Sequence, residues 1–252
     1  MSKCLIVTGG GRGIGAEVSR KAAKQGYSVC VNFHRDQTSA QKLVRELEKE
    51  GANALAYQAD VSQEEEVEAL FQTVEKDLGT PEALVNNAGI LDLQTRVDGM
   101  NAERIQRIFA VNVTGSFLCA REAVKRMSTK YGGKGGSIVN LSSGAAKYGS
   151  PGEYVDYAAS KAAIDTLTIG LAKEVAEEGI RVNAVRPGFI DTEIHQSGGE
   201  PDRMERVCPL VPMKRVGQAE EVADAIMWLL SDKASYITCL LYTSDAADEW
   251  IG

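Results

Sequence analysis

Two polar side chains four residues apart have the types needed for acid–base chemistry. Tyr157 and Lys161 lie in a stretch with the apolar spacing of a helix, so both are expected on one helix face. A phenol can donate a proton to a substrate oxygen, and an adjacent ammonium lowers the phenol pKa from an ordinary value near ~10. The spacing alone indicates little, because chance predicts about 0.4 Tyr-x-x-x-Lys pairs in a chain of this length and composition.

Two serines give this pair its context. Ser142 and Ser143 follow the apolar run 138–141, which has the length and residue types of a buried strand. Ligands of open α/β sheets bind at the carboxyl ends of the strands. We therefore expect a serine hydroxyl beside Tyr157 and Lys161, at a ligand-binding edge of the sheet.

A glycine-rich turn follows the first strand-like run, at residues 5–7. Its sequence is Thr8-Gly9-Gly10-Gly11-Arg12-Gly13-Ile14-Gly15. Glycines let the backbone approach a pyrophosphate, which then lies at the positive N-terminus of the following helix. The strict G-x-G-x-x-G fingerprint is absent, so a purely structural turn is the alternative. Its place at the first strand of a strand–helix series favours dinucleotide binding.

The end of the second strand bears on which dinucleotide binds. Enzymes that use NAD usually have an acidic residue there, which binds the ribose 2′-hydroxyl, but Phe33 stands at about that position. The basic residues Arg12, His34 and Arg35 could surround a 2′-phosphate, which arginine binds in bidentate fashion. The pattern favours NADP. NAD is the alternative, if Arg35 is only a solvated surface residue and Asp36 reaches the ribose.

The elements that must position these residues follow from the apolar pattern. Strand-like runs lie at about residues 5–7, 29–31, 55–57, 84–85, 138–141 and 181–185, and the clearest helical stretches lie at 102–127, 155–178 and 220–230. Ser62 and Glu65 are predicted to form a capping box at the start of another helix. The alternation predicts a single doubly wound Rossmann-type α/β domain, with a parallel sheet of about seven strands and helices on both faces.

Composition excludes several classes of function. The 252 residues carry 28 basic and 35 acidic side chains, a net charge of −7, and form no basic stripe for nucleic acid. With 2 histidines, a histidine-rich metal site is not expected, and 5 cysteines without a C-x-x-C pair fit a reducing compartment. No apolar run approaches the ~18 residues of a membrane span, and Met1 leads directly into a strand without a signal peptide. We therefore expect a soluble, cytoplasmic protein without a metal.

Several short motifs follow one another in a characteristic order along the chain. They are Thr8-Gly9 with Gly13-Ile14-Gly15, Asp60-Val61, Asn86-Asn87-Ala88-Gly89, Asn112, Ser143, Tyr157-Ala158-Ala159-Ser160-Lys161, and Arg186-Pro187-Gly188 with Thr192. In this order they resemble the short-chain dehydrogenase/reductase family, over about residues 3–238. The resemblance implies an NAD(P)-dependent oxidoreductase that transfers a hydride between NADP(H) and a carbonyl or secondary alcohol of the 3-oxoacyl, sugar or small-ketone class. It also implies a homo-oligomer, either a tetramer or a dimer. A cofactor-binding regulatory protein of the same fold, without turnover, is the alternative.

The resemblance implies a catalytic role for four residues. Tyr157 would be the general acid, and Lys161 would lower its pKa and hold the nicotinamide ribose. Asn112 would complete a proton relay through water to Lys161, with an interior helix hydrogen bond as its alternative role. Most family members place the serine that polarises the carbonyl 13 residues before the tyrosine. Ser143 lies 14 residues before it and Ser142 lies 15 before it, which favours Ser143 and leaves Ser142 as the alternative.

The resemblance also implies the residues that bind the cofactor. Asp60 would contact the adenine, with a strand-end cap as its alternative role, and Ile190 and Thr192 would meet the carboxamide. The full set is Thr8, Gly9, Arg12, Gly13, Ile14, Gly15, His34, Arg35, Asp60, Val61, Asn86, Ala88, Gly89, Tyr157, Lys161, Pro187, Gly188, Ile190 and Thr192.

Two C-terminal segments complete these expectations. Residues 193–212 contain two adjacent glycines and three prolines and are expected to form a mobile lid over the substrate. The family continues with Thr-Gly and a last strand, whereas this chain departs after Thr238. The peptide from Cys239 to Glu249 matches the translation of a transposon-end sequencing adapter. Residues 239–252 are therefore expected to be a non-native tail, whose apolar Leu240-Leu241-Tyr242 can imitate the last strand.

Overall fold

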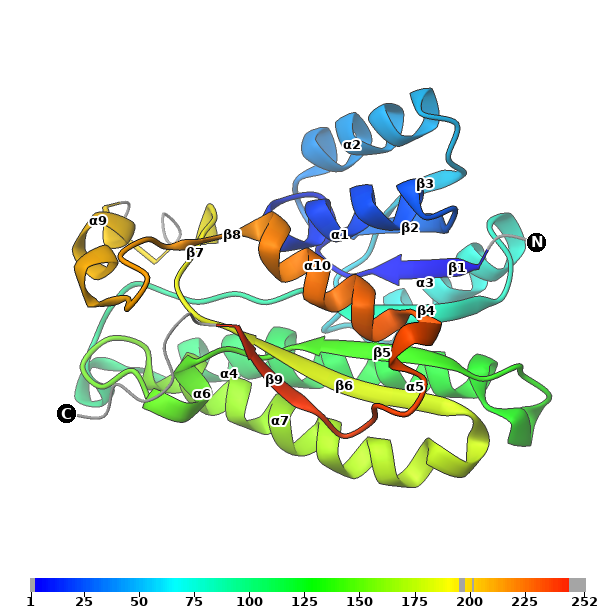
Figure 1. The fold of residues 1–252 in the computed structure, drawn as a ribbon. Coiled ribbons are helices and arrows are strands. Elements are labelled where there is room, and N and C mark those ends of the chain that lie inside the picture. Colours follow the sequence, from blue (N-terminus) through cyan, green and yellow to red (C-terminus); the bar gives the residue numbers. More distant parts are fainter. Residues whose placement is uncertain (1–2, 195–197, 201, 245–252) are drawn as a thin grey trace.

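The computed structural model describes residues 3–194, 198–200 and 202–244. Its main sheet contains strands at Cys4–Val7 (β1), Ser28–Phe33 (β2), Ala54–Gln58 (β3), Pro81–Asn86 (β4), Gly136–Leu141 (β5), Ile180–Pro187 (β6) and Leu241–Ser244 (β9). Their order is β3-β2-β1-β4-β5-β6-β9, and every neighbouring pair is parallel (Figure 1). A second, two-stranded sheet joins β7 (Ile190–Asp191) to β8 (Gly217–Gln218). The doubly wound parallel sheet predicted from the sequence is confirmed.

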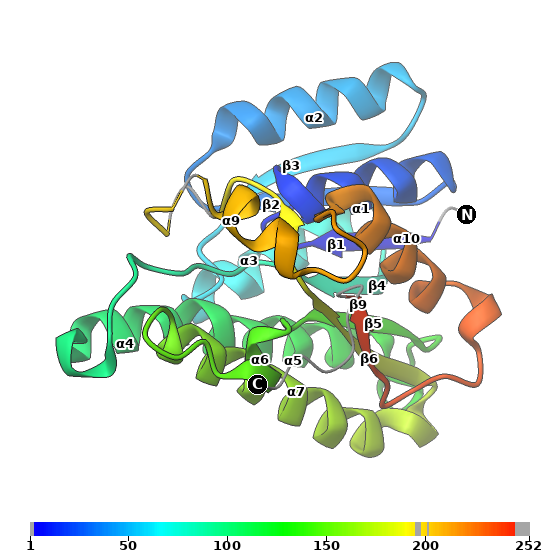
Figure 2. The same cartoon turned by 60° about the vertical axis from the view of Figure 1, so that its left-hand side comes forward.

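Helices cover both faces of the main sheet. One face carries α1 (Gly13–Lys24), α2 (Gln37–Lys49) and α10 (Ala219–Leu230), and the other carries α3 (Glu64–Asp77), α5 (Gly115–Met127) and α7 (Val155–Val175). Side chains of a strand alternate between faces, so Leu5 and Val7 pack in the core with α1, whereas Cys4 and Ile6 pack in the core with α3. Shorter helices are α4 (Ala102–Phe109), α6 (Ala145–Tyr148) and α9 (Arg203–Val207). Short 3₁₀ turns lie at Val97–Gly99, Thr129–Tyr131, Ala176–Glu178, Cys208–Leu210 and Asp232–Ala234. Figure 2 shows α4, α5 and α7 together on one side of the molecule.

The helical stretch predicted at 102–127 contains a π-helical turn. α4 passes into this turn at Ala110–Thr114, and α5 continues from its end. Such turns insert an extra residue into the helix and often occur at functional sites. Here the turn contains Asn112, whose side chain is completely buried.

The capping box predicted for Ser62 and Glu65 is wrong. α3 begins at Glu64 without a side-chain cap, and the Ser62 hydroxyl donates instead to the Asp60 carboxylate at 2.8 Å. Glu66, rather than Glu65, reaches back and accepts the backbone N–H of Asp60 at 2.7 Å. Asp60 binds the Ser62 hydroxyl in a local turn, so this hydroxyl does not cap α3. The glutamates in the first turn of α3 stabilise the N-terminus of the helix through the helix dipole.

The last strand of the main sheet comes from the segment that was expected to imitate it. β9 pairs with the end of β6, with Leu241 opposite Ala184 and Ser244 opposite Pro187. The rest of the expected tail, residues 245–252, lies outside the described residues. Within the described part of the chain, no helix has the length and apolar character needed to cross a membrane, and no cluster of histidine, cysteine or carboxylate side chains could hold a metal ion.

Candidate active site

A cavity of about 780 Å³ lies at the carboxyl ends of β1, β4, β5 and β6, the edge where ligands bind in open α/β sheets. The structure brings together in its lining many of the residues that the sequence predicted: Gly9, Arg12, Gly13, Ile14, Ala88, Gly89, Ser143, Tyr157, Lys161, Pro187, Gly188, Ile190 and Thr192. The remaining predicted residues, all in the described part of the chain, lie outside this lining: Thr8, Gly15, His34, Arg35, Asp60, Val61, Asn86 and Asn112.

The first turns of α7 bring Tyr157 and Lys161 to the end of β5. Burial raises the pKa of Tyr157, and a hydrogen bond between its hydroxyl and that of Ser143 lowers it. The phenol is therefore protonated at neutral pH, as a general acid must be. Lys161 Nζ lies 5.7 Å from the centre of the Tyr157 ring and donates to the Leu141 carbonyl at 2.6 Å. Burial lowers the pKa of Lys161 to about 8, and Asp165, one turn along α7, offsets part of that change.

The two candidate serines have different surroundings. Ser143 lines the cavity with Tyr157 and lowers its pKa, and Ser143 Oγ accepts the backbone N–H of Ala145 at 3.1 Å. Ser142 is buried, and its hydroxyl donates to the backbone carbonyl of Lys161 at 3.1 Å. Ser143 therefore has the position to polarise a carbonyl, and Ser142 joins β5 to α7.

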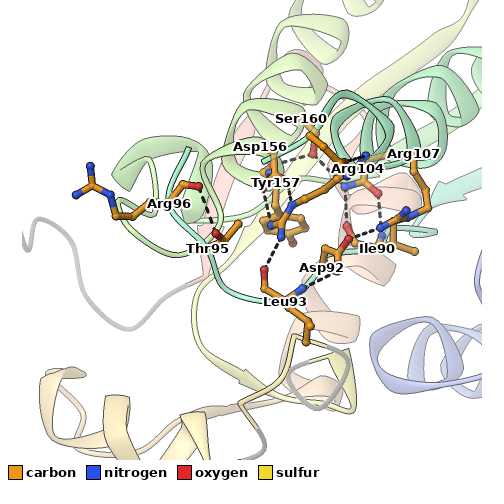
Figure 3. A network of polar contacts seen from close by, with 12 residues as sticks. Ile90, Asp92, Leu93, Thr95, Arg96, Arg104, Arg107, Asp156, Tyr157 and Ser160 are labelled. Atoms are coloured by element: carbon orange, nitrogen blue, oxygen red, sulfur yellow. Dashed lines mark hydrogen bonds and ion pairs between the residues drawn. The ribbon is translucent and has the colours of Figure 1, made fainter. Parts of the chain in front are cut away.

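Asn112 joins the backbone of Ile90 to the side chain of Ser160, which lies between Tyr157 and Lys161 in α7. Its Oδ1 accepts the N–H of Ile90 at 2.8 Å, and its Nδ2 donates to the Ile90 carbonyl at 2.9 Å and to Ser160 Oγ at 3.0 Å. The Ser160 hydroxyl in turn donates to the Tyr157 carbonyl at 2.7 Å (Figure 3). Sequence reasoning missed Ser160, although its position one turn after Tyr157 on the same helix was a usable signal. The proton relay through Asn112 stays a prediction.

The glycine turn is held by two residues of the neighbouring strand end. Thr8 Oγ1 accepts the N–H groups of Asn87 and Ala88, each at 3.0 Å, and Asn87 Nδ2 donates to the Thr8 and Gly9 carbonyls at 2.9 and 3.0 Å. Asn87 is a second residue that was missed. A Cβ at Gly15 would lie 2.6 Å from both Asn87 Nδ2 and the Gly9 oxygen, so only glycine fits there.

The N-terminus of α1 opens on the cavity. Its capping position, Arg12, is extended and makes no side-chain cap, and the first turn of α1 contains no acidic residue. Gly13 and Ile14, the first residues of the helix, line the cavity. Unpaired N–H groups and the positive end of the helix dipole are suited to an anion, so this turn fits the diphosphate of a dinucleotide.

The residues at the end of β2 surround an exposed, charged region. Phe33 has an apolar side chain that is buried, so it cannot bind a ribose hydroxyl. The Asp36 carboxylate accepts the N–H of Ser39 at 3.0 Å and lies 3.5 Å from Arg12 Nε. The bond to Ser39 holds the pKa of Asp36 below its usual value, and Arg12 adds to this effect. His34 and Arg35 are exposed.

Two residues predicted to contact the cofactor make hydrogen bonds within the protein. Asn86 is buried, and its Nδ2 donates to Asn140 at 2.9 Å and to the Ser116 carbonyl at 3.2 Å. The Asp60 carboxylate accepts the N–H and the hydroxyl of Ser62 at 3.0 and 2.8 Å. These bonds correspond to the strand-end cap that was the alternative for Asp60.

The segment expected to form a lid contributes Arg203 to the lining at the other end of the cavity, within the described residues 193–194, 198–200 and 202–212. Its Nη2 donates to Glu153 at 2.6 Å and its Nη1 to Glu200 at 2.8 Å. Its guanidinium lies 5.2 Å from the centre of the Tyr154 ring and 5.8 Å from that of Phe189. Hydrogen bonds from Arg206 and Arg203 lower the pKa of Glu200 to about 2. This segment is thus bound to the residues just before α7. The part of it at 195–197 and 201 lies outside the described residues.

Comparison with known proteins agrees with this geometry. A family model described as Enoyl-(Acyl carrier protein) reductase matches residues 9–246. The protein of Escherichia coli (strain K12) named Uncharacterized oxidoreductase YgfF is 58% identical over 233 residues, which cover 92% of this chain and 94% of that protein. Glucose 1-dehydrogenase 2 of Bacillus subtilis (strain 168) is 37% identical over 236 residues, covering 94% of this chain and 90% of that protein. The crystal structure of 3-ketoacyl-(acyl-carrier-protein) reductase from Brucella melitensis complexed with NADH has a TM-score of 0.89 at 30% identity and covers 97% of both chains. The chain belongs to the short-chain dehydrogenase/reductase family, whose members are oxidoreductases with a nicotinamide cofactor.

Proposed function

We propose that the protein reduces a ketone, or oxidises the corresponding secondary alcohol, with NADP(H) as its cofactor and Tyr157 as its acid. The observation that carries this proposal is that Tyr157, Ser143 and Lys161 line one cavity, with Lys161 Nζ 5.7 Å from the centre of the Tyr157 ring, and that this cavity continues to the open N-terminus of α1.

The chain's own residues would manage the proton and the orientation of the substrate. The nicotinamide ring supplies or accepts the hydride. Ser143 donates a hydrogen bond to the substrate carbonyl, and Tyr157 transfers its phenolic proton to the same oxygen. The charge of Lys161 stabilises the phenolate that remains, which a neutral neighbour would not do. Lys161 and the N–H groups of Gly13 and Ile14 would hold the ribose and the diphosphate.

Replacement of the phenol tests the assignment of the acid. With a panel of carbonyl substrates and NADPH, Tyr157→Phe should lower kcat by about 10³-fold, because the general acid is lost. Tyr148→Phe removes another phenolic hydroxyl from the same cavity and serves as the matched control, with kcat near that of the wild type. Full activity in Tyr157→Phe contradicts the assignment. NADPH binding without turnover of any substrate would favour the regulatory alternative.

The preference for NADP is supported by the residues around the end of β2. Arg12 is exposed beside the glycine turn, Arg35 and His34 are exposed nearby, and buried Phe33 replaces an acid. Asp36 is the competing feature, because its carboxylate lies near Arg12.

Two substitutions, one that removes a positive charge and one that removes a negative charge, test whether the protein prefers NADPH or NADH. Arg12→Gln should weaken NADPH binding about tenfold, the loss expected for one hydrogen bond to a charged group, and leave NADH binding within about twofold. Asp36→Asn should not weaken NADPH binding. Dissociation constants from fluorescence titration measure both effects, and a wild type that binds NADH more tightly than NADPH would contradict the preference.

The substrate end of the cavity favours an uncharged ketone with apolar substituents. Its walls include Ile90, Leu91, Phe189, Leu210 and Val211. Arg203 and Arg206 of the lid are both paired with Glu153 and Glu200. This leaves little basic surface for the phosphate of a carrier-linked thioester. We therefore expect kcat/KM to rank apolar ketones above 3-oxoacyl carrier thioesters and sugars, and the reverse order would contradict this substrate class.

We also propose that the protein assembles through the outer face of α4, α5 and α7. Phe117 is 49% exposed, Ile105 and Val155 are also exposed, and the outer face of α7 carries small residues at Ala159 and Gly170. A second copy of the chain would cover this apolar face in a dimer or tetramer. Sedimentation measures the prediction: Phe117→Glu should yield monomers. A matched change at exposed Tyr236, Tyr236→Glu, should leave the assembly intact.

A further inference from the structure

A buried ion pair lies directly behind Tyr157, outside the lining of the cavity. Arg104 of α4 and Asp156 in the first turn of α7 are joined by Nε–Oδ2 and Nη2–Oδ1 contacts of 2.6 and 3.4 Å. Their side chains are only 10% and 2% exposed. Figure 3 shows the arginine reaching from α4 to the start of α7, next to Tyr157.

Stability alone does not explain why such a pair is buried. Removing two charges from water costs several kcal/mol for each ion, and apolar residues of similar volume are often equally or more stabilising. The third guanidinium nitrogen of Arg104, Nη1, donates to the backbone carbonyl of Leu93 at 2.6 Å. The pair therefore fixes two places in the surrounding backbone, which is typical of a positioning function.

The first of these places is the backbone of Tyr157. α7 begins after Tyr154, whose side chain makes no cap. The Asp156 carboxylate instead accepts the N–H of Tyr157 at 2.9 Å, one of the N–H groups that a helix N-terminus leaves unpaired. The Tyr157 carbonyl accepts the Ser160 hydroxyl, which Asn112 holds. Both ends of the Tyr157 backbone are thus tied to the helical stretch that contains Arg104 and Asn112.

The second place is the loop that forms the facing part of the cavity wall. Arg104 binds the Leu93 carbonyl, and Arg107, one turn later, binds the Asp92 carboxylate (Figure 3). Asn112 binds both the backbone N–H and the backbone carbonyl of Ile90, at the start of the same loop. Ile90 and the residue after it line the cavity. One arginine therefore connects the helix that carries the acid to the loop that faces the substrate.

We propose that Arg104 and Asp156 are positioning residues, which set the place of the Tyr157 hydroxyl relative to the cavity wall at Ile90 and Leu91. The inference rests on the proposed function, in which Tyr157 is the acid. A displacement of about 1 Å at a reacting group can lower the rate on the order of 100-fold.

Three variants and one control test the proposal. Arg104→Met and Asp156→Leu each leave one buried charge unpaired, so both should unfold at lower urea and lose about 100-fold in kcat. The double variant replaces the pair by apolar side chains. Its stability should return towards that of the wild type while kcat stays about 100-fold lower, with NADPH affinity within about twofold. The control, Arg126→Met, breaks another pair with a buried acid, Glu122, at 2.8 Å on α5, and should lose stability without losing kcat.

Hydrogen exchange gives a readout that does not need turnover. The Tyr157 amide should exchange faster in Arg104→Met than in Arg126→Met, because only the first variant disturbs the carboxylate that accepts this N–H. The proposal is overturned if the double variant has kcat within about threefold of the wild type, if the control loses as much kcat as Arg104→Met, or if Tyr157 exchange is unchanged. A wild type that reduces no ketone would overturn the proposed function instead, and the exchange rates would still decide the positioning.

Discussion

Lys161 is a buried cation whose loss of hydration opposes folding. Burial lowers its pKa from 10.5 to about 8. Each pH unit between the pKa values of the folded and unfolded states corresponds to 1.36 kcal/mol, so the charged amine lowers the free energy of unfolding by about 3 kcal/mol at neutral pH. The ammonium group proposed for catalysis therefore lowers the free energy of unfolding, as polar groups of active sites commonly do.

Lys161→Met removes this charge and keeps most of the side-chain volume. The variant loses the donor to the Leu141 carbonyl, which costs about 1–2 kcal/mol. It should therefore be more stable than the wild type by about 1–2 kcal/mol near pH 7, and it should not turn over substrate.

The sign of the difference should reverse in alkaline solution. Because the folded-state pKa is lowered, the unfolded state binds more protons between about pH 8 and pH 10.5, and the wild type gains stability relative to the variant across that window. The two proteins should be equally stable between roughly pH 9 and 10, and the variant should be the less stable one above that range.

Urea unfolding followed by circular dichroism, at about pH 7 and about pH 10.5, measures the difference. Lys173→Met is the matched control, since Lys173 is exposed on the same helix, and its stability difference should not depend on pH in this way. The reasoning is refuted if the difference between Lys161→Met and the wild type is the same at both pH values, or if the variant is the less stable protein at pH 7.

Four further substitutions address the two serines, the lid and the start of the last strand. Ser143→Ala should lower kcat about 100-fold. Ser142→Ala should mainly lower the free energy of unfolding, by about 1 kcal/mol, because only its bond to the Lys161 carbonyl is lost. The opposite result in steady-state kinetics would exchange the roles of the two serines. Arg203→Met breaks the ion pair of the lid with Glu153 and should raise KM by about tenfold with a smaller effect on kcat, and an unchanged KM would contradict the lid. Cys239→Gly should raise the free energy of unfolding by about 1 kcal/mol, because residue 239 has a φ of +68°, where glycine is favoured; a lower melting temperature would contradict this.

The conformation of Cys239 also bears on the end of the chain. The family continues with glycine after the threonine that corresponds to Thr238, and the left-handed backbone at Cys239 is the one that such a glycine would adopt. This supports the proposal that residues 239–252 are a non-native tail. The codons of the gene would test it, because codons that differ from those of the sequencing adapter would contradict an artefact.

Local pattern in the sequence was sufficient for the architecture and for the edge of the sheet at which the cavity lies. Apolar runs of strand length between helical stretches predicted the parallel sheet, because burial on both faces requires such runs. Spacing placed Tyr157 and Lys161 on one helix face and the glycine turn at a strand end, whereas the roles predicted for them came from the family resemblance.

Tertiary packing decided which side chains meet, because those contacts join segments that are distant in the sequence. Spacing favoured Ser143 and left Ser142 as the alternative, because the geometry of the loop at the end of β5 determines which hydroxyl faces the cavity. Arg104 and Asp156 lie 52 positions apart, and their ion pair exists only because α4 packs against the start of α7. The sequence by itself determined the elements and the chemistry at their ends. The packing of those elements decided which side chains support that chemistry, because hydrogen bonds and ion pairs depend on distances that sequence separation does not contain.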